Sequence, residues 1–178
     1  MSLTEIDITE LSINPITMIG AEWWLLTAGN VVDGCNTMTA AWGSIGAIWD
    51  RKVNNRKTIL PTITVFVRPQ RYTKDFIDKE ELFTLSVFDS EYKKVLGYLG
   101  SHSGRDENKI EKAGLNPVFD YDTTYFEEAK MVFICRKIYR GEIKEHEFID
   151  TSIIDENYPT KDFHHMYIGE IIKVLVRE

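Results

Sequence analysis

The chain has 178 residues, of which 43% are hydrophobic and 12% aromatic, and its formal net charge is −7. This size and composition indicate one globular domain with a single hydrophobic core. The 28 acidic residues outnumber the 21 basic ones, which argues against general binding of nucleic acids or anionic membranes, because either would need a broad basic face. A few clustered arginines in an acidic chain favour one small anionic ligand instead.

Cysteine usage and the N-terminal residues exclude further classes. Cys35 and Cys135 are too few and too far apart for a disulfide framework or a Cys-x-x-Cys metal site, so we expect both to be small buried hydrophobes. The first residues lack a basic region followed by an apolar core, and no apolar run approaches about 18 residues. We therefore expect a cytoplasmic protein that does not associate with membranes.

In chain order, residues 16–19 and 22–28 read as two short strands around Gly20. Asp33-Gly34 predicts a tight turn into a strand that starts at Asn36, and so a hairpin. Residues 45–61, with a basic cluster and Pro61, predict a loop. This loop is either solvated or a flap that covers a ligand or contacts a phosphorylated nicotinamide.

The rest of the chain alternates short strands with few helices. Alternating apolar residues and β-branched runs predict strands, whereas apolar spacing of three and four residues predicts helices. The strands are expected at residues 62–67, 82–88, 128–143, 147–150 and 166–176, and the helices at 74–79, 91–100 and 106–113. Without βαβ alternation or a Gly-x-Gly-x-x-Gly motif, an antiparallel barrel fits better than a dinucleotide-binding fold.

A candidate anion site follows the strand at 62–67. In Arg68-Pro69-Gln70-Arg71-Tyr72-Thr73 the proline ends regular strand pairing, so two guanidinium groups project from one short loop. The Thr73 hydroxyl is expected to cap the helix at 74–79, where a phosphate could also meet backbone N–H groups. The alternative is that both arginines are solvated charges at a strand end.

Two further stretches suit a phosphorylated planar ligand. Ser101-His102-Ser103-Gly104-Arg105-Asp106 combines hydroxyls, a glycine and an arginine, which suit a close approach to phosphate. Residues 35–44 are small, polar and neutral, and they include Trp42 but no strong base. This segment could lie flat against a planar ring and contact it through main-chain groups.

These motifs carry a family resemblance. Asn-Thr-Met-Thr-Ala-Ala-Trp-Gly at 36–43, Arg-Pro-Gln-Arg-Tyr-Thr at 68–73, Ser-x-Ser-Gly-Arg-Asp at 101–106 and His-x-x-Tyr-Ile-Gly-Glu-Ile at 164–171 together resemble the flavin reductase-like, FMN-binding split-barrel family. The flavoredoxin branch is the most similar, and the resemblance runs from about Ile16 to Val174. The chain departs from the family at residues 51–61, which are longer than the pattern implies.

The resemblance implies a six-stranded antiparallel split β-barrel of Greek-key type with peripheral α-helices. It implies one domain over residues 1–178, with a core at about 16–174, and a homodimer that places FMN near the subunit interface. The implied cofactor-binding residues are Asn36, Thr37, Met38, Thr39, Ala40, Trp42, Arg68, Gln70, Arg71, Tyr72, Thr73, Ser101, Ser103, Gly104, Arg105 and His164. For the dimer interface we expect residues 128–143 and 166–176, with Trp49, His164 and Tyr167 reaching across.

Protein groups that could carry the chemistry themselves are missing from the sequence. We find no nucleophile–base pair, no metal-ligand spacing and no carboxylate pair for acid–base work, so a flavin would carry the electrons. His164 either borders the flavin or the interface, or is a packed histidine.

Three functions remain open at this point: a flavin reductase that takes hydride from NADH or NADPH, an electron carrier reduced by a partner protein, and a non-enzymatic ligand-binding module. In the first two, electrons leave to a small-molecule or protein acceptor.

Overall fold

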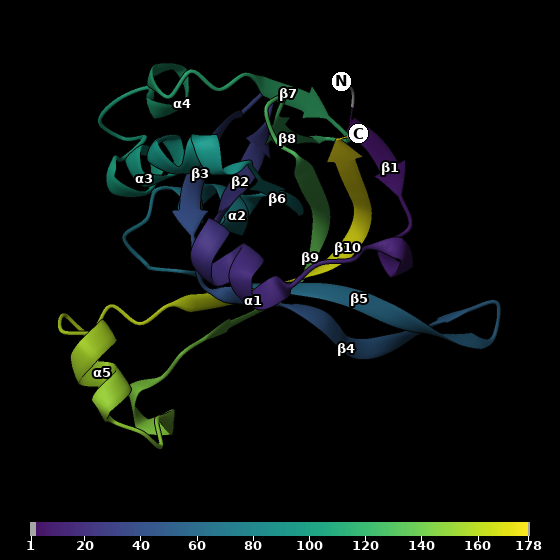
Figure 1. Cartoon of the computed structure of the whole chain (residues 1–178). Coiled ribbons are helices and arrows are strands. Elements are labelled where there is room, and N and C mark those ends of the chain that lie inside the picture. Colours follow the sequence, from purple (N-terminus) through teal and green to yellow (C-terminus); the bar gives the residue numbers. More distant parts are fainter. Residues whose placement is uncertain (1–2, 178) are drawn as a thin grey trace.

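Two long C-terminal strands form the centre of the fold in the computed structural model, which describes residues 3–177 (Figure 1). They are β9 (Met131–Glu142) and β10 (His165–Arg177), which pair along almost their whole length. The main antiparallel sheet runs in the order β3-β2-β6-β9-β10-β5-β4, and β1 also pairs with β10. The other strands are β1 (Leu3–Ile6), β2 (Trp24–Asn30), β3 (Gly34–Ala40), β4 (Gly43–Val53), β5 (Arg56–Val67) and β6 (Leu82–Val87).

Both faces of this sheet are covered, which explains why β2 and β6 are buried along almost their full length. Successive side chains of a strand point to opposite faces, so Leu26 joins one core cluster and Leu25 the other. The first cluster, which contains Trp24, Phe83 and Tyr167, fills the concave side of the curved sheet. The second lies beneath the helices and the small hairpin of β7 (Pro117–Asp120) and β8 (Thr123–Phe126).

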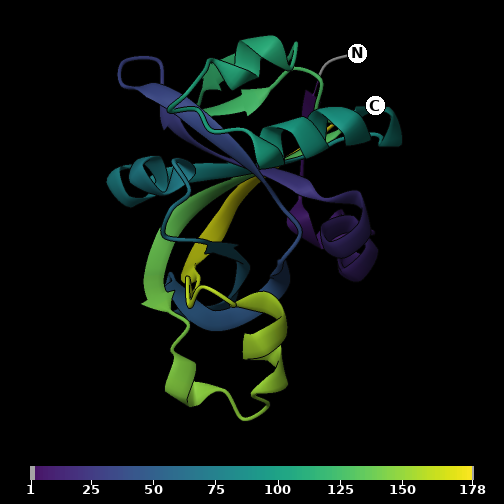
Figure 2. The same cartoon turned by 90° about the vertical axis from the view of Figure 1, so that its left-hand side faces the viewer.

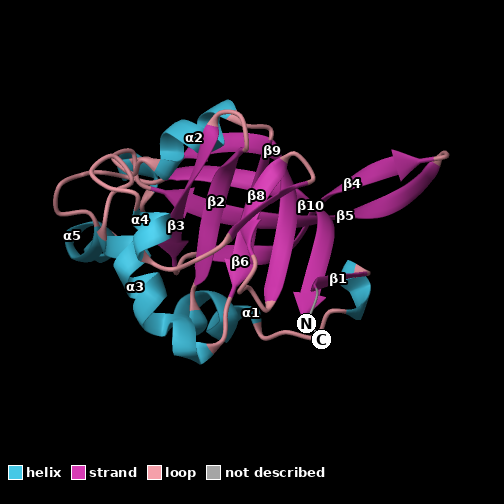
Figure 3. Cartoon of the chain, turned by 90° about the horizontal axis from the view of Figure 1, so that it is seen from above, coloured by secondary structure: helices cyan, strands magenta, loops and turns pink. Residues whose placement is uncertain are grey.

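Short helices surround the sheet, as Figures 1 and 3 show. They are η1 (Ile8–Glu10), α1 (Pro15–Thr17), η2 (Met18–Glu22), α2 (Thr73–Lys79), η3 (Ser90–Tyr92), α3 (Lys93–Ser101), α4 (Lys109–Lys112), η4 (Glu145–Glu147) and α5 (Ser152–Asn157). None of the helices within residues 3–177 is long and apolar enough to cross a membrane.

The predicted mainly β antiparallel fold with peripheral helices is confirmed, but the main sheet has eight strands instead of six. Six strands predicted from the sequence are present as β2, β3, β5, β6, β9 and β10. The two additional strands are β1 and β4. β1 is short and mixed in polarity, and β4 is exposed on both faces near its end, so neither has the apolar alternation that marks a half-buried strand.

Three local predictions are wrong. Residues 16–19 are helical, because the Asn14 side chain accepts hydrogen bonds from the main-chain N–H groups of Ile16 and Thr17 and caps a helical turn. Residues 147–150 form no strand; Glu147 ends η4, and residues 148–150 continue a segment that leaves the sheet. Residues 45–61 are a β-hairpin and not a loop.

The hairpin at residues 45–61 depends on a tight turn at two asparagines, which the basic composition of this stretch does not reveal. Asn54 and Asn55 have φ values of 51° and 62°, as in the type I′ turn that suits the right-handed twist of two-residue hairpins. Residues 62–67 of β5 pair with β10 on their second side, whereas residues 56–61 pair only with β4. We call residues 47–61 the arm, and Figures 1 and 3 show it projecting beyond the rest of the sheet.

A second projection lies between β9 and β10. Residues 143–164, which include η4 and α5, leave the sheet and return to it at the start of β10 (Figure 2). Its return places His164 beside the end of β5, because His165 is the register partner of Val67.

Candidate functional site

A cavity of about 180 Å³ lies where the end of β3, the end of β5 and the start of β10 meet. It joins three stretches that are far apart in the sequence, and its lining residues are Met38, Thr39, Ala40, Ala41, Trp42, Phe66, Arg68, Arg71 and His164. Of the sequence-predicted site residues, the structure therefore gathers Met38, Thr39, Ala40, Trp42, Arg68, Arg71 and His164 around one opening.

The wall of this cavity formed by β3 has a specific chemical property. β3 is the last strand of the sheet and pairs only with β2, so one of its edges presents main-chain N–H and C=O groups without ladder partners. The exposed indole of Trp42 follows directly after this edge. The combination can hold a flat, polar-edged ring through main-chain groups and an aromatic face.

His164 is buried at the back of the cavity. Its Nδ1 lies 2.9 Å from the hydroxyl of Tyr158, and its ring centroid lies 4.9 Å from that of Trp42. Burial, with a contribution from the positive charge of Arg68, lowers the pKa of His164 to about 4. The imidazole is therefore neutral at pH 7, and its hydrogen bonding, not its charge, contributes to the site.

Arg68 links the cavity to the segment that precedes β10. Its Nη1 lies 2.6 Å from Asp162 Oδ2, and its Nη2 donates to the main-chain oxygen of Asn157 at 2.8 Å. Gln70 Nε2 donates to the same carboxylate at 2.7 Å. The hydrogen bonds from Gln70 and Arg68 hold the pKa of Asp162 well below its usual range despite partial burial. Arg68 thus anchors residues 157–162 as well as lining the cavity.

Arg71 approaches the cavity from the opposite wall, next to the C-terminal end of α3. Its Nη1 donates to the main-chain oxygen of Gly100 at 2.9 Å, and the buried Lys109 Nζ donates to the oxygens of Leu99 and His102, each at 2.9 Å. Burial, together with the charge of Arg71, lowers the pKa of Lys109 to about 8. Two cations therefore satisfy the carbonyl groups at this helix end, where the helix dipole favours positive charge.

Arg105 does not line this cavity. Its Nη2 lies 2.7 Å from Asp75 Oδ2, its Nη1 donates to the main-chain oxygen of Gln70 at 3.1 Å, and its guanidinium carbon lies 4.6 Å from the ring centroid of Tyr72. Arg68 and Arg71 therefore line the cavity on one side of the loop at 68–73, whereas Arg105 lies on its other side.

Asn36, Tyr72 and Gly104 meet behind the loop, beside Arg105. A Cβ atom on Gly104 would lie 2.2 Å from Asn36 Oδ1, so this position requires glycine. Asn36 Nδ2 donates to the Thr73 hydroxyl at 2.8 Å. The predicted capping role of Thr73 is wrong, because Tyr72 occupies the N-cap position and Thr73 is already the first residue of α2.

The remaining predicted hydroxyl residues bond to the protein itself. Thr37 is buried and its hydroxyl lies 2.9 Å from that of Thr27, and Thr39 donates to the main-chain oxygen of Leu96 at 2.5 Å. Ser101 donates to the main-chain oxygen of Gly97 at 3.0 Å, and Ser103 accepts from the Arg105 N–H at 3.2 Å. Of these four, only Thr39 lines the cavity.

Sequence reasoning missed three residues that shape the site, Phe66, Tyr158 and Asp162. Phe66 reads as an ordinary residue of the strand at 62–67, and Tyr158 belongs to none of the sequence motifs. Asp162 gives no local signal because its partner, Arg68, is distant in the sequence.

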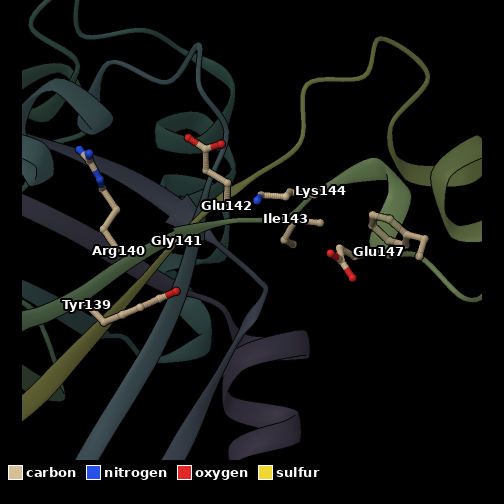
Figure 4. Close-up of a pocket in the computed structure, with 8 residues that line it drawn as sticks. Tyr139, Arg140, Gly141, Glu142, Ile143, Lys144 and Glu147 are labelled. Carbon is tan, nitrogen blue, oxygen red and sulfur yellow. The ribbon is translucent and has the colours of Figure 1, made fainter.

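Other cavities hold fewer of the predicted residues than the seven gathered beside β3. One of about 470 Å³ is lined by Asn36, Tyr72, Gly104 and Arg105, and one of about 430 Å³ is lined by Trp42. One of about 680 Å³ lies where β9 ends and the 143–164 segment begins; Figure 4 shows Arg140, Glu142, Lys144 and Glu147 around it. Across the described part of the chain, no group of three or more His, Cys, Asp or Glu side chains is placed to hold a metal ion. The cavity beside β3 is therefore the candidate site.

An antiparallel sheet curled around a buried core cluster, with a small cavity beside its edge strand, is typical of a split-barrel protein. Residues 59–178 match the family model described as "Flavin reductase like domain". The chain belongs to this family, as the sequence motifs indicated.

Solved structures support the assignment of the fold. Flavoredoxin of Desulfovibrio vulgaris (Miyazaki F) is 26% identical, with a TM-score of 0.62, over 88% of this chain and 69% of that one. An FMN-binding domain of a flavin reductase-like enzyme from Shewanella baltica is 16% identical, with a TM-score of 0.64, over 98% and 77% of the two chains. An NADH:FAD oxidoreductase of Streptomyces globisporus is 14% identical, with a TM-score of 0.59, over 88% and 74%. No match was found among curated proteins.

Proposed function

We propose that the chain binds FMN in the cavity beside β3 and acts as an FMN-dependent oxidoreductase. The observation that carries this proposal is the convergence of three motifs, residues 38–42, Arg68 with Arg71, and His164, on one opening. The names of similar proteins describe them as flavin-binding, and they include both FMN-binding and FAD-binding examples. FMN is favoured here because the chain has no dinucleotide-binding motif and offers arginine next to a short hydroxyl-rich loop.

The residues present fit such a ligand. The open edge of β3 would supply main-chain donors for the polar edge of the ring, and Trp42 an aromatic surface. Arg71 uses one guanidinium nitrogen on Gly100, and a guanidinium has five N–H donors, so it can still bond to a phosphate. Neutral His164 adds no positive charge next to the ring.

A bound flavin would supply the electron and hydride chemistry. The protein's part is to orient the ring against β3, to hold the phosphate through Arg71 and to keep water from the buried side at His164. Tyr158 fixes the orientation of His164 through the hydrogen bond to Nδ1. Arg68, held by Asp162 and Asn157, keeps the segment carrying Tyr158 next to the site.

A second copy of the chain is part of this proposal. Cavities that hold small ligands usually measure about 300–1,000 Å³, whereas this one measures about 180 Å³ in a single chain. A homodimer would add the missing wall and cover the ring. Tyr167 is removed from the expected dimer interface. Its side chain is fully buried and donates to Asp78 Oδ1 at 2.7 Å, so it cannot contact a second subunit.

The electron donor follows from one experiment. The purified protein should be yellow and release FMN on denaturation, and anaerobic NADH or NADPH should bleach its visible absorbance if the nicotinamide is the donor. Bleaching only by a protein or chemical reductant would indicate the electron carrier instead. A colourless protein that takes up no added FMN would contradict the proposed function and leave a binding module without flavin.

A further inference from the structure

The arm is a two-stranded ribbon with few contacts to the rest of the chain: Arg51 pairs with Glu170 of β10, and the Trp49 ring centroid lies 6.4 Å from that of Tyr139. Beyond the pair Ala47 and Pro61, β4 is the sole partner of β5 among the described strands, and every residue from 46 to 59 is exposed. Seven residues of strand extend about 20 Å, and an isolated two-stranded hairpin is only marginally stable in water. Four large apolar side chains are nevertheless exposed on it: Ile48, Trp49, Val53 and Ile59. Such a ribbon gains stability when it packs against another surface.

The charge of the arm indicates that the surface against which it packs is acidic. Residues 47–61 contain four basic residues and one acidic residue, in a chain whose net charge is −7, so the rest of the molecule is strongly acidic. Arg51 pairs with Glu170 at 2.8 Å and Lys57 with Asp50 at 2.6 Å. Lys52 and Arg56 have no ion-pair partner among residues 3–177. The arm therefore presents uncompensated positive charge beside apolar side chains.

The same chain carries a groove with the complementary composition. A cavity of about 810 Å³ lies between the β2–β3 turn, the residues before β6 and the β7–β8 turn. Five carboxylates line it, and no basic residue does among the described residues: Asp33, Glu80, Glu81, Asp120 and Asp122. Its apolar lining is also exposed, with Val31, Val32, Phe119 and Tyr121. We call this cavity the acidic groove.

The acidic groove has unsatisfied capacity for a cation. Lys79 pairs with Asp33 at 2.9 Å at the rim. Inside, Glu80 Oε2 accepts from Asn30 at 3.2 Å, but Glu80 Oε1 is shielded from water and has no hydrogen-bond partner within residues 3–177. The carboxylates of Glu81, Asp120 and Asp122 are exposed and have no ion-pair partner among residues 3–177, so they remain available to basic side chains of another chain.

We propose that the arm of one copy docks in the acidic groove of a second copy. Each copy has one arm and one groove, so two-fold symmetry makes both contacts at once and closes the assembly as a dimer. The arm continues β4, which begins at Gly43 directly after Trp42, so the arm and the β3 wall of the candidate site belong to one stretch of chain. Arm docking does not require a bound flavin.

The test is a charge swap followed by sedimentation-velocity ultracentrifugation of the full chain. One variant reverses the arm with Lys52→Glu and Arg56→Glu; another reverses the groove with Glu81→Lys and Asp120→Lys. Asp122 is left unchanged because its φ of 58° suits Asp better than Lys. The control, Lys94→Glu with Lys144→Glu, makes the same change in net charge as the arm reversal, at two exposed positions outside both surfaces.

Wild type and control should sediment as a dimer of the 20.6 kDa chain. Each reversal should raise the dimer dissociation constant at least tenfold. The four-fold variant, which carries all four substitutions of the two reversals, should recover at least part of the lost dimer affinity. Because this recovery needs both folded surfaces, it also distinguishes docking from misfolding. Amide hydrogen exchange in residues 47–61 and 119–123 should slow as the wild-type protein is concentrated.

Three results would overturn the proposal. They are a wild-type monomer at every concentration, dimer affinity unchanged by both reversals, and a four-fold variant that stays monomeric although its melting temperature matches wild type. If the monomeric wild type binds vesicles with 25% phosphatidylserine and the arm reversal abolishes this, the arm is a membrane contact instead. Loss of flavin binding with an intact dimer would contradict the proposed function alone.

Discussion

Arg68 Nη1 and Asp162 Oδ2 lie 2.6 Å apart and join the end of β5 to the residues just before β10. Both side chains are largely buried, at 24% and 16% exposed, so this pair should contribute more than a surface ion pair. We expect Asp162→Asn to lower the free energy of unfolding by about 1–3 kcal/mol. A double-mutant cycle with Arg68→Met, measured by urea unfolding, should give a coupling free energy above about 0.5 kcal/mol. Additive effects would show that the pair is not an anchor.

Arg71→Ala should weaken FMN binding much more than riboflavin binding. The two ligands differ by the phosphate, and losing a charge-assisted hydrogen bond costs about 1.5–3 kcal/mol, or roughly tenfold to a hundredfold in affinity. Fluorescence titration of both flavins measures the difference. Arg105→Ala is the matched control, because Arg105 pairs with Asp75 away from the cavity. Equal weakening of both ligands by Arg71→Ala would mean that this guanidinium does not contact the phosphate.

Stability should fall on acidification because of His164. Its pKa is about 4 in the folded chain, below the ordinary value of 6.5, so the unfolded chain takes up the proton first as the pH falls. Above about pH 6.5 the His164 imidazole is neutral in both the folded and the unfolded chain, so it does not change the free energy of unfolding. Between pH 6.5 and 4 its titration lowers the free energy of unfolding by on the order of 2 kcal/mol. His164→Gln should remove this share of the loss.

Melting temperatures of wild type and His164→Gln between pH 7.5 and 4.5 measure this contribution. The exposed His146→Gln is the control and should follow wild type. Identical slopes for His164→Gln and wild type would mean that His164 does not titrate in this window.

Added FMN should stabilise the fold and oppose dissociation of the dimer. A ligand at 100 times its dissociation constant contributes about 2.7 kcal/mol, which corresponds to roughly 5–10 °C for a chain of this size. Differential scanning fluorimetry measures the shift, and dilution series with and without FMN measure the dimer. A monomer that retains full FMN affinity at high dilution would show that one chain is enough to form the site.

Local patterns in the sequence were sufficient for β2, β6, β9, β10 and residues 62–67 of β5, because apolar alternation and β-branched runs reflect a sheet buried on one or both faces. The turn signal at Asp33-Gly34 was sufficient for β3. The same reasoning failed at residues 45–61. There the strands are exposed on both faces, so no alternation marks them, and only the left-handed conformations of Asn54 and Asn55 reveal the turn.

From the sequence alone came the four family motifs, at residues 36–43, 68–73, 101–106 and 164–171, and with them the candidate site residues. Only the tertiary structure decided which side chains face the opening. Strand register brings His164 beside Arg68, whereas Arg105 turns to Asp75 and Thr37 to the core. Partners such as Arg68 and Asp162 meet across distant segments, and their contact depends on how the sheet curls. Sequence spacing alone contains no such information.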